Sequence, residues 1–186
     1  MADNQGSVNR VHPLPVVRLR GTFIVSEAVV DATRAALIAF AQAGNADGGH
    51  EGILYWSGRA IGDTTVVLGA VVPDATHDRY RVHVTPEQIG AVARAAHAHR
   101  LGVLCQVHSH PGRDTRHSDG DDDLVLMPFE GMLSIVVPDY GRGSWAIADC
   151  GVHQYQDRRW ARCAPDSVRE SLIVVPVVTD QRRPIP

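Results

Sequence analysis

The chain has 186 residues, of which 44% are hydrophobic and 21% are charged, and its formal net charge is −3. This composition is typical of one globular domain with a sizeable core, and it excludes collagen-like, coiled-coil and wholly disordered chains. The balance of 18 basic and 21 acidic side chains provides no basic field that would attract nucleic acid or anionic lipid.

The first part of the chain predicts an arm, one or two strands and a helix. Residues 1–15 are polar with two prolines and indicate a loose arm. Residues 16–20 and 22–25 are typical of a short strand or strand pair. Ser26 is a helix cap, and apolar residues at spacings of three and four extend the predicted helix to Gly44.

The middle of the chain predicts three strands and a second helix. The strands are expected over 51–57, 64–72 and 80–84. Residues 58–63 and 73–79 are expected to connect them. Thr85, Pro86 and Gln88 form a strong helix start, because the threonine caps the helix, the proline suits its first position and the glutamine completes a capping box. We expect this helix to end near Arg100, before Gly102.

The last part of the chain predicts several strands and a short helix. Residues 103–107 are almost all apolar and predict a buried strand that leads to His108. Ser118 is expected to cap a short helix that runs to about Leu126. The later segments are expected to be strands over 132–137, 144–149 and 152–156, a polar connection over 157–167 and an apolar segment over 172–178. Because strands and helices are mixed, the sequence predicts an α/β or α+β fold with a mixed central sheet flanked by helices.

The stretch from His108 to Asp121 carries the residues that indicate chemistry. His108 and His110 lie at the end of an apolar strand, where residues two apart face the same side, so both imidazoles can bind one ion. Asp121 falls in the first turn of the helix after Ser118, where the helix dipole favours a carboxylate, and it can supply a third ligand. Two nitrogens and one oxygen leave the fourth tetrahedral position open for water, as in a catalytic zinc site.

Two neighbouring carboxylates compete with Asp121 for the place of third ligand. Asp122 and Asp123 follow it directly, and the register after the serine favours Asp121, with Asp123 as a solvated bystander. His50 and His117 are close to the candidate residues in sequence but fit no ligand position. We interpret both histidines as residues at the rim of the site.

The spacing H-x-H-x7-S-x2-D resembles the JAMM motif of the JAB/MPN zinc metallopeptidase family. The resemblance covers residues 16–157 and implies the MPN/JAB-like fold, with its cytidine-deaminase-like architecture. It implies one zinc ion per chain, with His108, His110 and Asp121 as ligands. It also implies that the hydroxyl of Ser118 stabilises the oxyanion of the reaction.

The family also has an upstream glutamate on an early strand, and Glu51 is similar to it because it starts a strand after a Gly-rich loop. In this role the carboxylate takes a proton from the attacking water and later gives it to the leaving amine. Glu27 and Glu87 are alternatives, but both lie at predicted helix starts, where a carboxylate has a capping explanation. Asp47 lies in the Gly-rich loop.

Members of this family cleave amide or isopeptide bonds, usually after the C-terminus of a ubiquitin-like protein. The resemblance therefore implies such a protein, or its conjugates, as the substrate. An extended substrate tail can add to the strand edge beside residues 73–83, where Arg79 and Arg81 would face its carbonyls or acidic side chains. The short loops resemble bacterial stand-alone members, which work beside E1-like and E2-like enzymes, some of them in antiphage defence.

Two other functions stay open at this point. Some relatives process ubiquitin-like sulfur-carrier proteins, and others have lost the metal and act as scaffolds. A nucleic-acid accessory role is disfavoured by the acidic charge balance. The sequence does not decide between removal of conjugates and processing of precursors, and it leaves the oligomeric state open.

The domain organisation and location follow from the same patterns. We expect a metallopeptidase domain over 16–160 after the arm 1–15, with a C-terminal extension over 161–186 packed on the same domain. There is no apolar run of about 20 residues and no secretory signal at the N-terminus, and three widely spaced cysteines predict no disulfide framework. These features favour a cytoplasmic protein without a membrane partner.

Overall fold

The computed structural model describes residues 13–44, 46, 48–125 and 127–179. Most of the predicted arm over 1–15 therefore lies outside the described residues. The helices and strands in chain order are β1 (Val16–Val17), β2 (Thr22–Ser26), α1 (Glu27–Ala43), β3 (Ile53–Ile61), β4 (Thr64–Val71), β5 (Thr76–His77), β6 (Val82–His83), α2 (Pro86–Ala98), β7 (Gly102–Ser109), α3 (Asp119–Asp122), β8 (Leu133–Val137), η2 (Asp139–Gly141), η3 (Ile147–Asp149), β9 (Gly151–Gln156), β10 (Arg159–Cys163), α4 (Pro165–Ser171) and β11 (Leu172–Val175).

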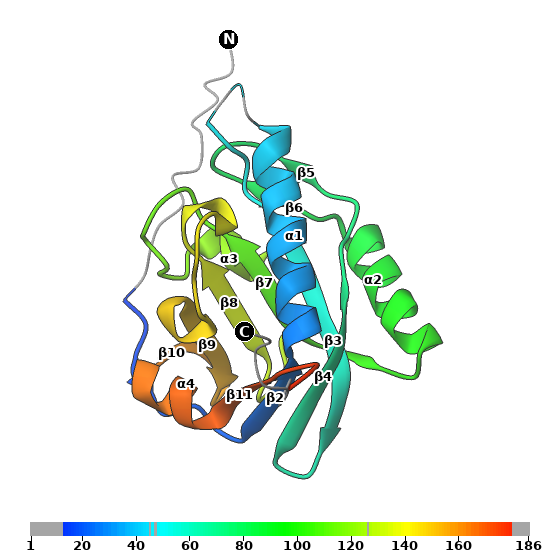
Figure 1. The fold of residues 1–186 in the computed structure, drawn as a ribbon, viewed down its shortest axis with the longest axis vertical. Helices are drawn as coiled ribbons and strands as arrows, with labels where there is room; N and C mark the ends of the chain where they lie inside the picture. The colour runs from blue at the N-terminus through cyan, green and yellow to red at the C-terminus, as the bar shows by residue number, and fades with distance from the viewer. Residues whose placement is uncertain (1–12, 45, 47, 126, 180–186) are drawn as a thin grey trace, which may run out of the picture.

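The strands of the described residues form a nine-stranded mixed sheet with the order β1-β10-β9-β8-β7-β3-β4-β2-β11, and β5 pairs with β6 in a separate small sheet. Helix α1 crosses one face of the large sheet, and α2 lies beside β3 (Figure 1). The prediction of a mixed central sheet flanked by helices is confirmed. No helix in the described part of the chain combines the length and the apolar character needed to cross a bilayer.

Strand β3 separates two apolar cores because its side chains alternate between the faces of the sheet. Leu54 and Trp56 belong to the larger core, to which α1 contributes, whereas Ile53 and Tyr55 belong to the smaller core, to which α2 contributes. All four side chains are buried. Packing on both faces of the sheet therefore fixes the position of β3, and with it the position of the residues that precede the strand.

The two long helices begin where the sequence predicts them. The hydroxyl of Ser26 accepts a hydrogen bond from the Val29 N–H at the start of α1. At the start of α2, Thr85 and Gln88 exchange the two hydrogen bonds of a capping box. Both predicted caps are confirmed, and α1 ends before Gly44 as expected.

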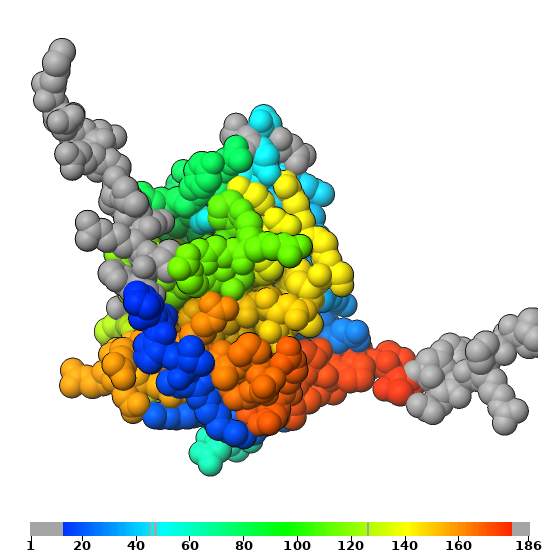
Figure 2. Space-filling model, turned by 90° about the vertical axis from the view of Figure 1, so that its left-hand side faces the viewer, coloured from blue at the N-terminus to red at the C-terminus, as the bar shows by residue number. Residues whose placement is uncertain are grey.

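The first two strands do not pair with each other. β1 pairs with β10, whereas β2 lies between β4 and β11 at the other end of the sheet. Figure 2 shows the blue N-terminal segment lying along the orange segment that contains β10 and α4. The chain links these distant strands through residues 18–21, where the Arg20 N–H donates to Oε1 of Gln154 on β9 at 2.9 Å.

Strand β3 is longer than predicted. Residues 58–61, which the sequence predicts as part of a connection, extend the strand and pair with residues 64–67. Only Gly62 and Asp63 remain for the turn of this hairpin. Gly62 has a φ of 58°, in the left-handed region that glycine adopts without steric cost.

Two predictions near the C-terminus are wrong. Residues 144–149 are expected to form a strand but contain the short helix η3. The N–H of Ala146, the residue before this helix, donates to a carboxylate oxygen of Asp149, and this hydrogen bond closes a turn in place of an extended strand. Residues 157–167 are expected to form a polar connection but contain β10 and the beginning of α4. A tight turn after β9 lets β10 pair back on it.

The helix after Ser118 is shorter than predicted. α3 ends at Asp122, whereas the sequence predicts a helix that runs to about Leu126, which lies outside the described residues. The four residues of α3 are Asp-Gly-Asp-Asp. Glycine has a low helix propensity and neighbouring carboxylates repel each other, so this composition disfavours further helical turns.

Substitution of Thr33 by valine is expected to destabilise the fold. The buried hydroxyl of Thr33 accepts a hydrogen bond from Nε1 of Trp56 at 2.9 Å and donates to the Val29 carbonyl at 2.8 Å. Valine would leave the indole N–H without its acceptor, and we expect the free energy of unfolding to fall by about 1–3 kcal/mol in urea denaturation. The exposed Thr76→Val control should change it by less than about 0.5 kcal/mol. Equal stability of both variants would contradict this account of the indole contact.

Candidate metal centre

Strands β3 and β7 are neighbours in the middle of the sheet, and their pairing sets the position of the site. The antiparallel register brings His108 opposite the first residue of β3, so Glu51 comes opposite His110 just beyond the strand ends. The Ser109 N–H donates to the Gly52 carbonyl at 3.0 Å, and the Gly52 N–H donates to Oγ of Ser109 at 3.0 Å. These bonds extend the pairing as far as the candidate residues.

Three ligand atoms converge at this point. Nε2 of His108 lies 3.2 Å from Oδ1 of Asp121, and Nε2 of His110 lies 3.5 Å from the same oxygen. The three atoms all lie within 4.8 Å of one another. Metal–ligand bonds of about 2.0–2.2 Å at tetrahedral angles separate ligand atoms by about 3.3–3.5 Å. The distances of both histidine nitrogens from Oδ1 of Asp121 therefore suit ligands of one tetrahedral metal ion.

The hydrogen bonding of the histidines also indicates a cation. Nε2 of His108 is buried and forms no hydrogen bond of suitable geometry among the described residues, although Oδ1 of Asp121 lies 3.2 Å away; a metal ion bound between the two atoms would use the lone pair of Nε2. Nδ1 of His110 lies 2.9 Å from the Asp114 carbonyl oxygen. A proton on Nδ1 can be donated to that carbonyl, which leaves the lone pair of Nε2 for a metal ion.

Asp121 is held in place and in its charged state. Its Oδ2 accepts a hydrogen bond from the Ser118 N–H at 2.7 Å, which leaves Oδ1 for the histidine side of the site. Burial alone would raise the pKa of Asp121, but His108 and His110 beside it hold this pKa well below its usual range. The carboxylate is therefore ionised at neutral pH and can bind a cation.

Two buried polar residues that the sequence analysis does not predict connect α3 to the sheet. Nε2 of Gln106 donates to the Asp121 carbonyl at 3.1 Å and to Oγ of Ser134 at 2.9 Å. Gln106 lies on β7 and Ser134 on β8, and both are fully buried. The signal in the sequence is one polar residue inside each of two apolar strands, and these residues tie the metal-ligand helix to the sheet.

Glu51 lies across a small cavity from Asp121. The cavity has a volume of about 290 Å³ and is lined by Glu51, by Arg81 and the β6 strand, and by α3 with the residues after it. Burial, together with the nearby carboxylates of Asp121 and Asp78, raises the pKa of Glu51 to about 7. A carboxyl group with such a pKa can both accept and donate a proton near neutral pH.

Ser118 occupies the N-cap position of α3, but its hydroxyl makes no capping hydrogen bond. This differs from the predicted side-chain cap, because the main-chain N–H of Ser118 is what bonds to α3, through Asp121. The side chain is buried next to the metal ligands in sequence and space. The helix therefore makes no use of the hydroxyl, which is left for another role.

The structure separates Glu51 and Asp121 from their alternatives. Glu27 and Glu87 are exposed in the first turns of α1 and α2, and Asp47 lies outside the described residues. Asp122 and Asp123 are exposed. Within the described ranges, the group of residues with metal-ligand spacing contains neither of them and consists of His108, His110 and Asp121.

The two candidate substrate-binding arginines are placed differently. Arg81 lines the cavity with Glu51. Arg79 is not among the residues that line this cavity; its guanidinium lies over the ring of Tyr80 and its carbonyl accepts a hydrogen bond from the Tyr140 hydroxyl at 3.0 Å. The structure thus brings Arg81 to the candidate site and leaves Arg79 beside it.

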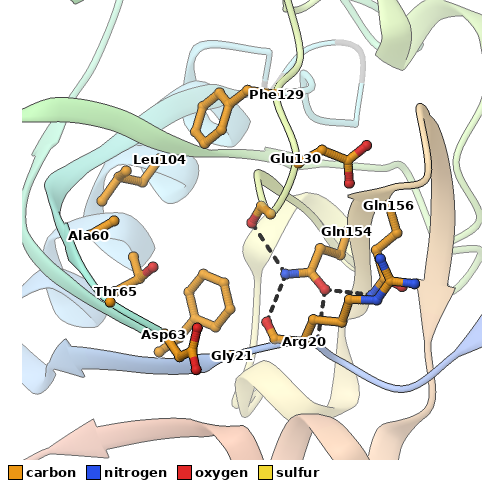
Figure 3. A pocket seen from close by; sticks show the side chains of 13 residues that line it. Arg20, Gly21, Ala60, Asp63, Thr65, Leu104, Phe129, Glu130, Gln154 and Gln156 are labelled. Carbon is orange, nitrogen blue, oxygen red and sulfur yellow. Dashed lines mark hydrogen bonds between the residues drawn. The ribbon is translucent and has the colours of Figure 1, made fainter.

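A different cavity, of about 330 Å³, lies at the other end of β7, where Leu104 and Phe129 face Arg20 and Gln154 (Figure 3). The side chain of Gln154 accepts a hydrogen bond from the Arg20 N–H and donates to the carbonyls of Arg20 and Gly131. Its polar atoms therefore have protein partners. Nothing in this cavity indicates chemistry.

Three comparisons relate this chain to known proteins. The chain matches a family model described as prokaryotic homologs of the JAB domain over residues 33–163. It is similar to a probable metalloprotease, y4jG, of Sinorhizobium fredii (strain NBRC 101917 / NGR234), with 29% identity over 136 residues that cover 68% of this chain and 80% of that protein. It also resembles the solution structure of protein DSY2949 from Desulfitobacterium hafniense, with a TM-score of 0.59, 15% identity, and coverage of 83% of this chain and 93% of that one. The last likeness concerns the fold alone.

Proposed function

Because this chain belongs to the family of prokaryotic homologs of the JAB domain, the JAMM/JAB metallopeptidases, we propose that it is a zinc-dependent isopeptidase or peptidase that acts after the C-terminus of a ubiquitin-like protein. The family and the metalloprotease relative support a metal-dependent peptidase. The observation that carries the proposal is the convergence of His108, His110 and Asp121 in a buried site that faces Glu51. Zinc is the proposed metal because two imidazoles and one carboxylate are a typical catalytic zinc set.

The roles of the side chains follow from their places. A metal ion bound by the three ligands would polarise the scissile carbonyl and make the attacking water more acidic. Glu51 accepts the proton of that water on its carboxylate and delivers it to the leaving amine. The hydroxyl of Ser118 donates a hydrogen bond to the oxygen on which negative charge develops. Asp121 stays ionised throughout, because its pKa lies far below neutrality.

The cavity beside Glu51 supports an extended peptide as substrate. Strand β6 lines this cavity and pairs only with β5 among the described strands. A substrate tail can therefore add to the edge of β6 through main-chain hydrogen bonds, with Arg81 beside it. The proposed substrates are a ubiquitin-like protein and its conjugates. The proposed partners are E1-like and E2-like enzymes of a bacterial conjugation system. Processing of a sulfur-carrier precursor is the alternative reaction at the same site.

The test is mass spectrometry of candidate ubiquitin-like proteins before and after incubation with the zinc-loaded enzyme. Each candidate is offered in two forms, one with a short C-terminal extension and one joined through an isopeptide bond to lysine. We expect loss of the extension or of the conjugate with wild type and neither with Glu51→Ala. A protein that holds zinc but cleaves no amide bond would be a scaffold, and the proposal would be wrong.

Substitution of Ser118 by alanine is expected to lower kcat/KM by about 100-fold, as when one oxyanion donor is removed. Because the Ser118 hydroxyl makes no hydrogen bond to α3, the melting temperature and the zinc content should stay close to those of wild type. Steady-state kinetics, thermal denaturation and metal analysis of the same preparations provide the three values. A loss of stability without a loss of rate would assign the hydroxyl a structural role instead.

The rate should fall on the acid side of neutrality. Glu51 must be ionised to accept a proton, and burial raises its pKa to about 7; a bound cation lowers this pKa, so the acid limb is expected at or below pH 7. On that limb kcat/KM should drop about tenfold per pH unit. A profile of kcat/KM from about pH 5 to pH 8 measures this, and a rate that rises as the pH falls would contradict the role of Glu51 as base.

A further inference from the structure

Two buried histidines outside the metal centre have ring nitrogens without partners. Nε2 of His117 and Nδ1 of His153 are both buried and form no hydrogen bond within the described part of the chain. The two residues are 4% and 1% exposed, and their ring centroids lie 5.2 Å apart. Burial of a polar atom without a hydrogen-bond partner is unfavourable. These two ring nitrogens therefore indicate a partner outside the described residues.

Both rings line one small cavity. It has a volume of about 120 Å³ and is also lined by Pro13, Leu14, Arg116 and Arg162. A single water needs only about 10–15 Å³ of such space, so the cavity has room for a small anion. His153 and Arg162 are direct neighbours across the antiparallel pair β9–β10, which places a guanidinium beside an imidazole.

One positive charge on the walls of this cavity has no ion pair with a carboxylate of the described residues. Arg116 is paired with Asp114 at 2.7 Å. Arg162 donates to Oγ1 of Thr115 at 3.2 Å, and no ion pair joins it to a carboxylate of the described ranges. Burial lowers the pKa of His117 to about 4 and that of His153 to about 3. Both imidazoles are therefore neutral, and each has one N–H to donate.

The orientation of His117 is compatible with a donor role. Its Nδ1 lies 3.6 Å from Oδ1 of Asp122, which is beyond hydrogen-bond distance. No hydrogen bond within the described residues fixes the proton on either ring nitrogen, so an oxyanion bound beside Nε2 would select the tautomer that carries its proton on Nε2. With the guanidinium of Arg162 and an N–H of His153, this makes a set of donors that suits an oxyanion.

A larger cavity, of about 450 Å³, lies next to the small one. It is lined by His117 and Leu14, which also line the small cavity, and by Ser118, Asp119 and Asp122. Asp119 also lines the cavity of Glu51. Because the three cavities share lining residues along the segment from His117 to Asp119, a substrate held at the metal centre can extend toward β6 with one end and toward His117 with the other.

We propose that His117, His153 and Arg162 form a subsite for a carboxylate, namely the free C-terminal carboxylate of the peptide released on the leaving side. This inference rests on the proposed function and narrows its substrate class. A precursor with a short C-terminal extension has such a carboxylate within reach, whereas a lysine inside a folded conjugate partner does not. The subsite thus favours precursor processing over deconjugation.

The test is a binding measurement that does not depend on turnover. The probe is a peptide that ends in Gly-Gly and two further residues, prepared as the free acid and as the C-terminal amide, and titrated by calorimetry into the zinc-loaded Glu51→Ala protein. We expect the acid to bind about tenfold more tightly than the amide. Adding Arg162→Gln should bring this ratio close to one. The exposed Arg59→Gln on β3 is the matched control and should keep the tenfold ratio.

Acetate and inorganic phosphate are titrated into the same proteins. These titrations distinguish a peptide carboxylate from a free inorganic anion as the ligand of the subsite. Competition of acetate with the peptide acid, lost in Arg162→Gln, supports the subsite. Equal binding of acid and amide to the protein with an intact Arg162 would overturn the proposed subsite. Phosphate binding that depends on Arg162 but has no effect on binding of the peptide would also overturn it, because the site would then bind a free anion. If the peptides show the expected ratio but wild type cleaves neither the extended nor the conjugated ubiquitin-like proteins in the mass-spectrometric test, the proposed function fails and the carboxylate subsite stands. His153→Phe, checked by its melting temperature, is a second variant that should reduce the ratio.

Discussion

Substitution of Glu51 by alanine is expected to lower kcat/KM by about three orders of magnitude while the protein keeps its metal ion. General acid–base catalysis contributes a factor of about 100 to 10,000, and Glu51 is the buried carboxyl that lines one cavity with Asp121 and lies close enough to His110 to interact with its charge. It is not itself part of the group with metal-ligand spacing. Kinetics with a fluorogenic ubiquitin-like amide substrate and elemental analysis of the same sample test both parts of the prediction.

The matched control for this variant is Glu27→Ala. Glu27 is an exposed glutamate in the first turn of α1, so its loss should change kcat/KM by less than about twofold. Glu51→Gln should resemble Glu51→Ala, because an amide keeps the shape of the side chain but cannot accept the proton. Turnover within tenfold of wild type in either Glu51 variant would remove this residue from the role of general base.

Substitution of His108 by alanine is expected to abolish metal binding. Even the outer partners of metal ligands contribute about 10- to 100-fold to affinity, and a direct ligand contributes more. We therefore expect the zinc content to fall from one per chain to below about 0.1, and the activity to fall with it. His108 is fully buried in the central strand β7, so the melting temperature must be measured alongside the metal content.

Thermal denaturation with and without a chelator separates loss of metal from loss of fold. The wild-type melting temperature should fall when the metal is removed, because a ligand that binds only the native state stabilises it. His108→Ala should melt at one temperature under both conditions. His97→Ala, an exposed histidine on α2, should behave like wild type. A His108→Ala protein that retains one zinc per chain would contradict the ligand assignment.

The sequence predicts the same three candidate ligands that the structure brings together, because their geometry is local. His108 and His110 are two apart at a strand end, so the alternation of a strand suffices to place both rings on one side. Asp121 lies one helical turn after the position of Ser118. Glu51 is different, because it meets His110 only through the pairing of β3 with β7, and the sequence indicated it through the family resemblance.

The segments that were predicted wrongly contain local turns that their residue types mark only weakly. The turn between β9 and β10 is made by Asp157 and Arg158, with φ of 53° and 64°. Neither glycine nor asparagine marks this left-handed turn, so the usual hairpin signal is absent. The pairing of His153 with Arg162 follows from that hairpin, and for this reason the small cavity beside these two residues could not be predicted either.

The most direct test of the account is a crystal structure of the zinc-loaded protein with anomalous scattering data collected at the zinc edge. We expect one anomalous peak per chain, bonded to Nε2 of His108, Nε2 of His110 and a carboxylate oxygen of Asp121, with no fourth protein ligand. An empty site, or a peak whose coordination is closed by a fourth side chain, would contradict it.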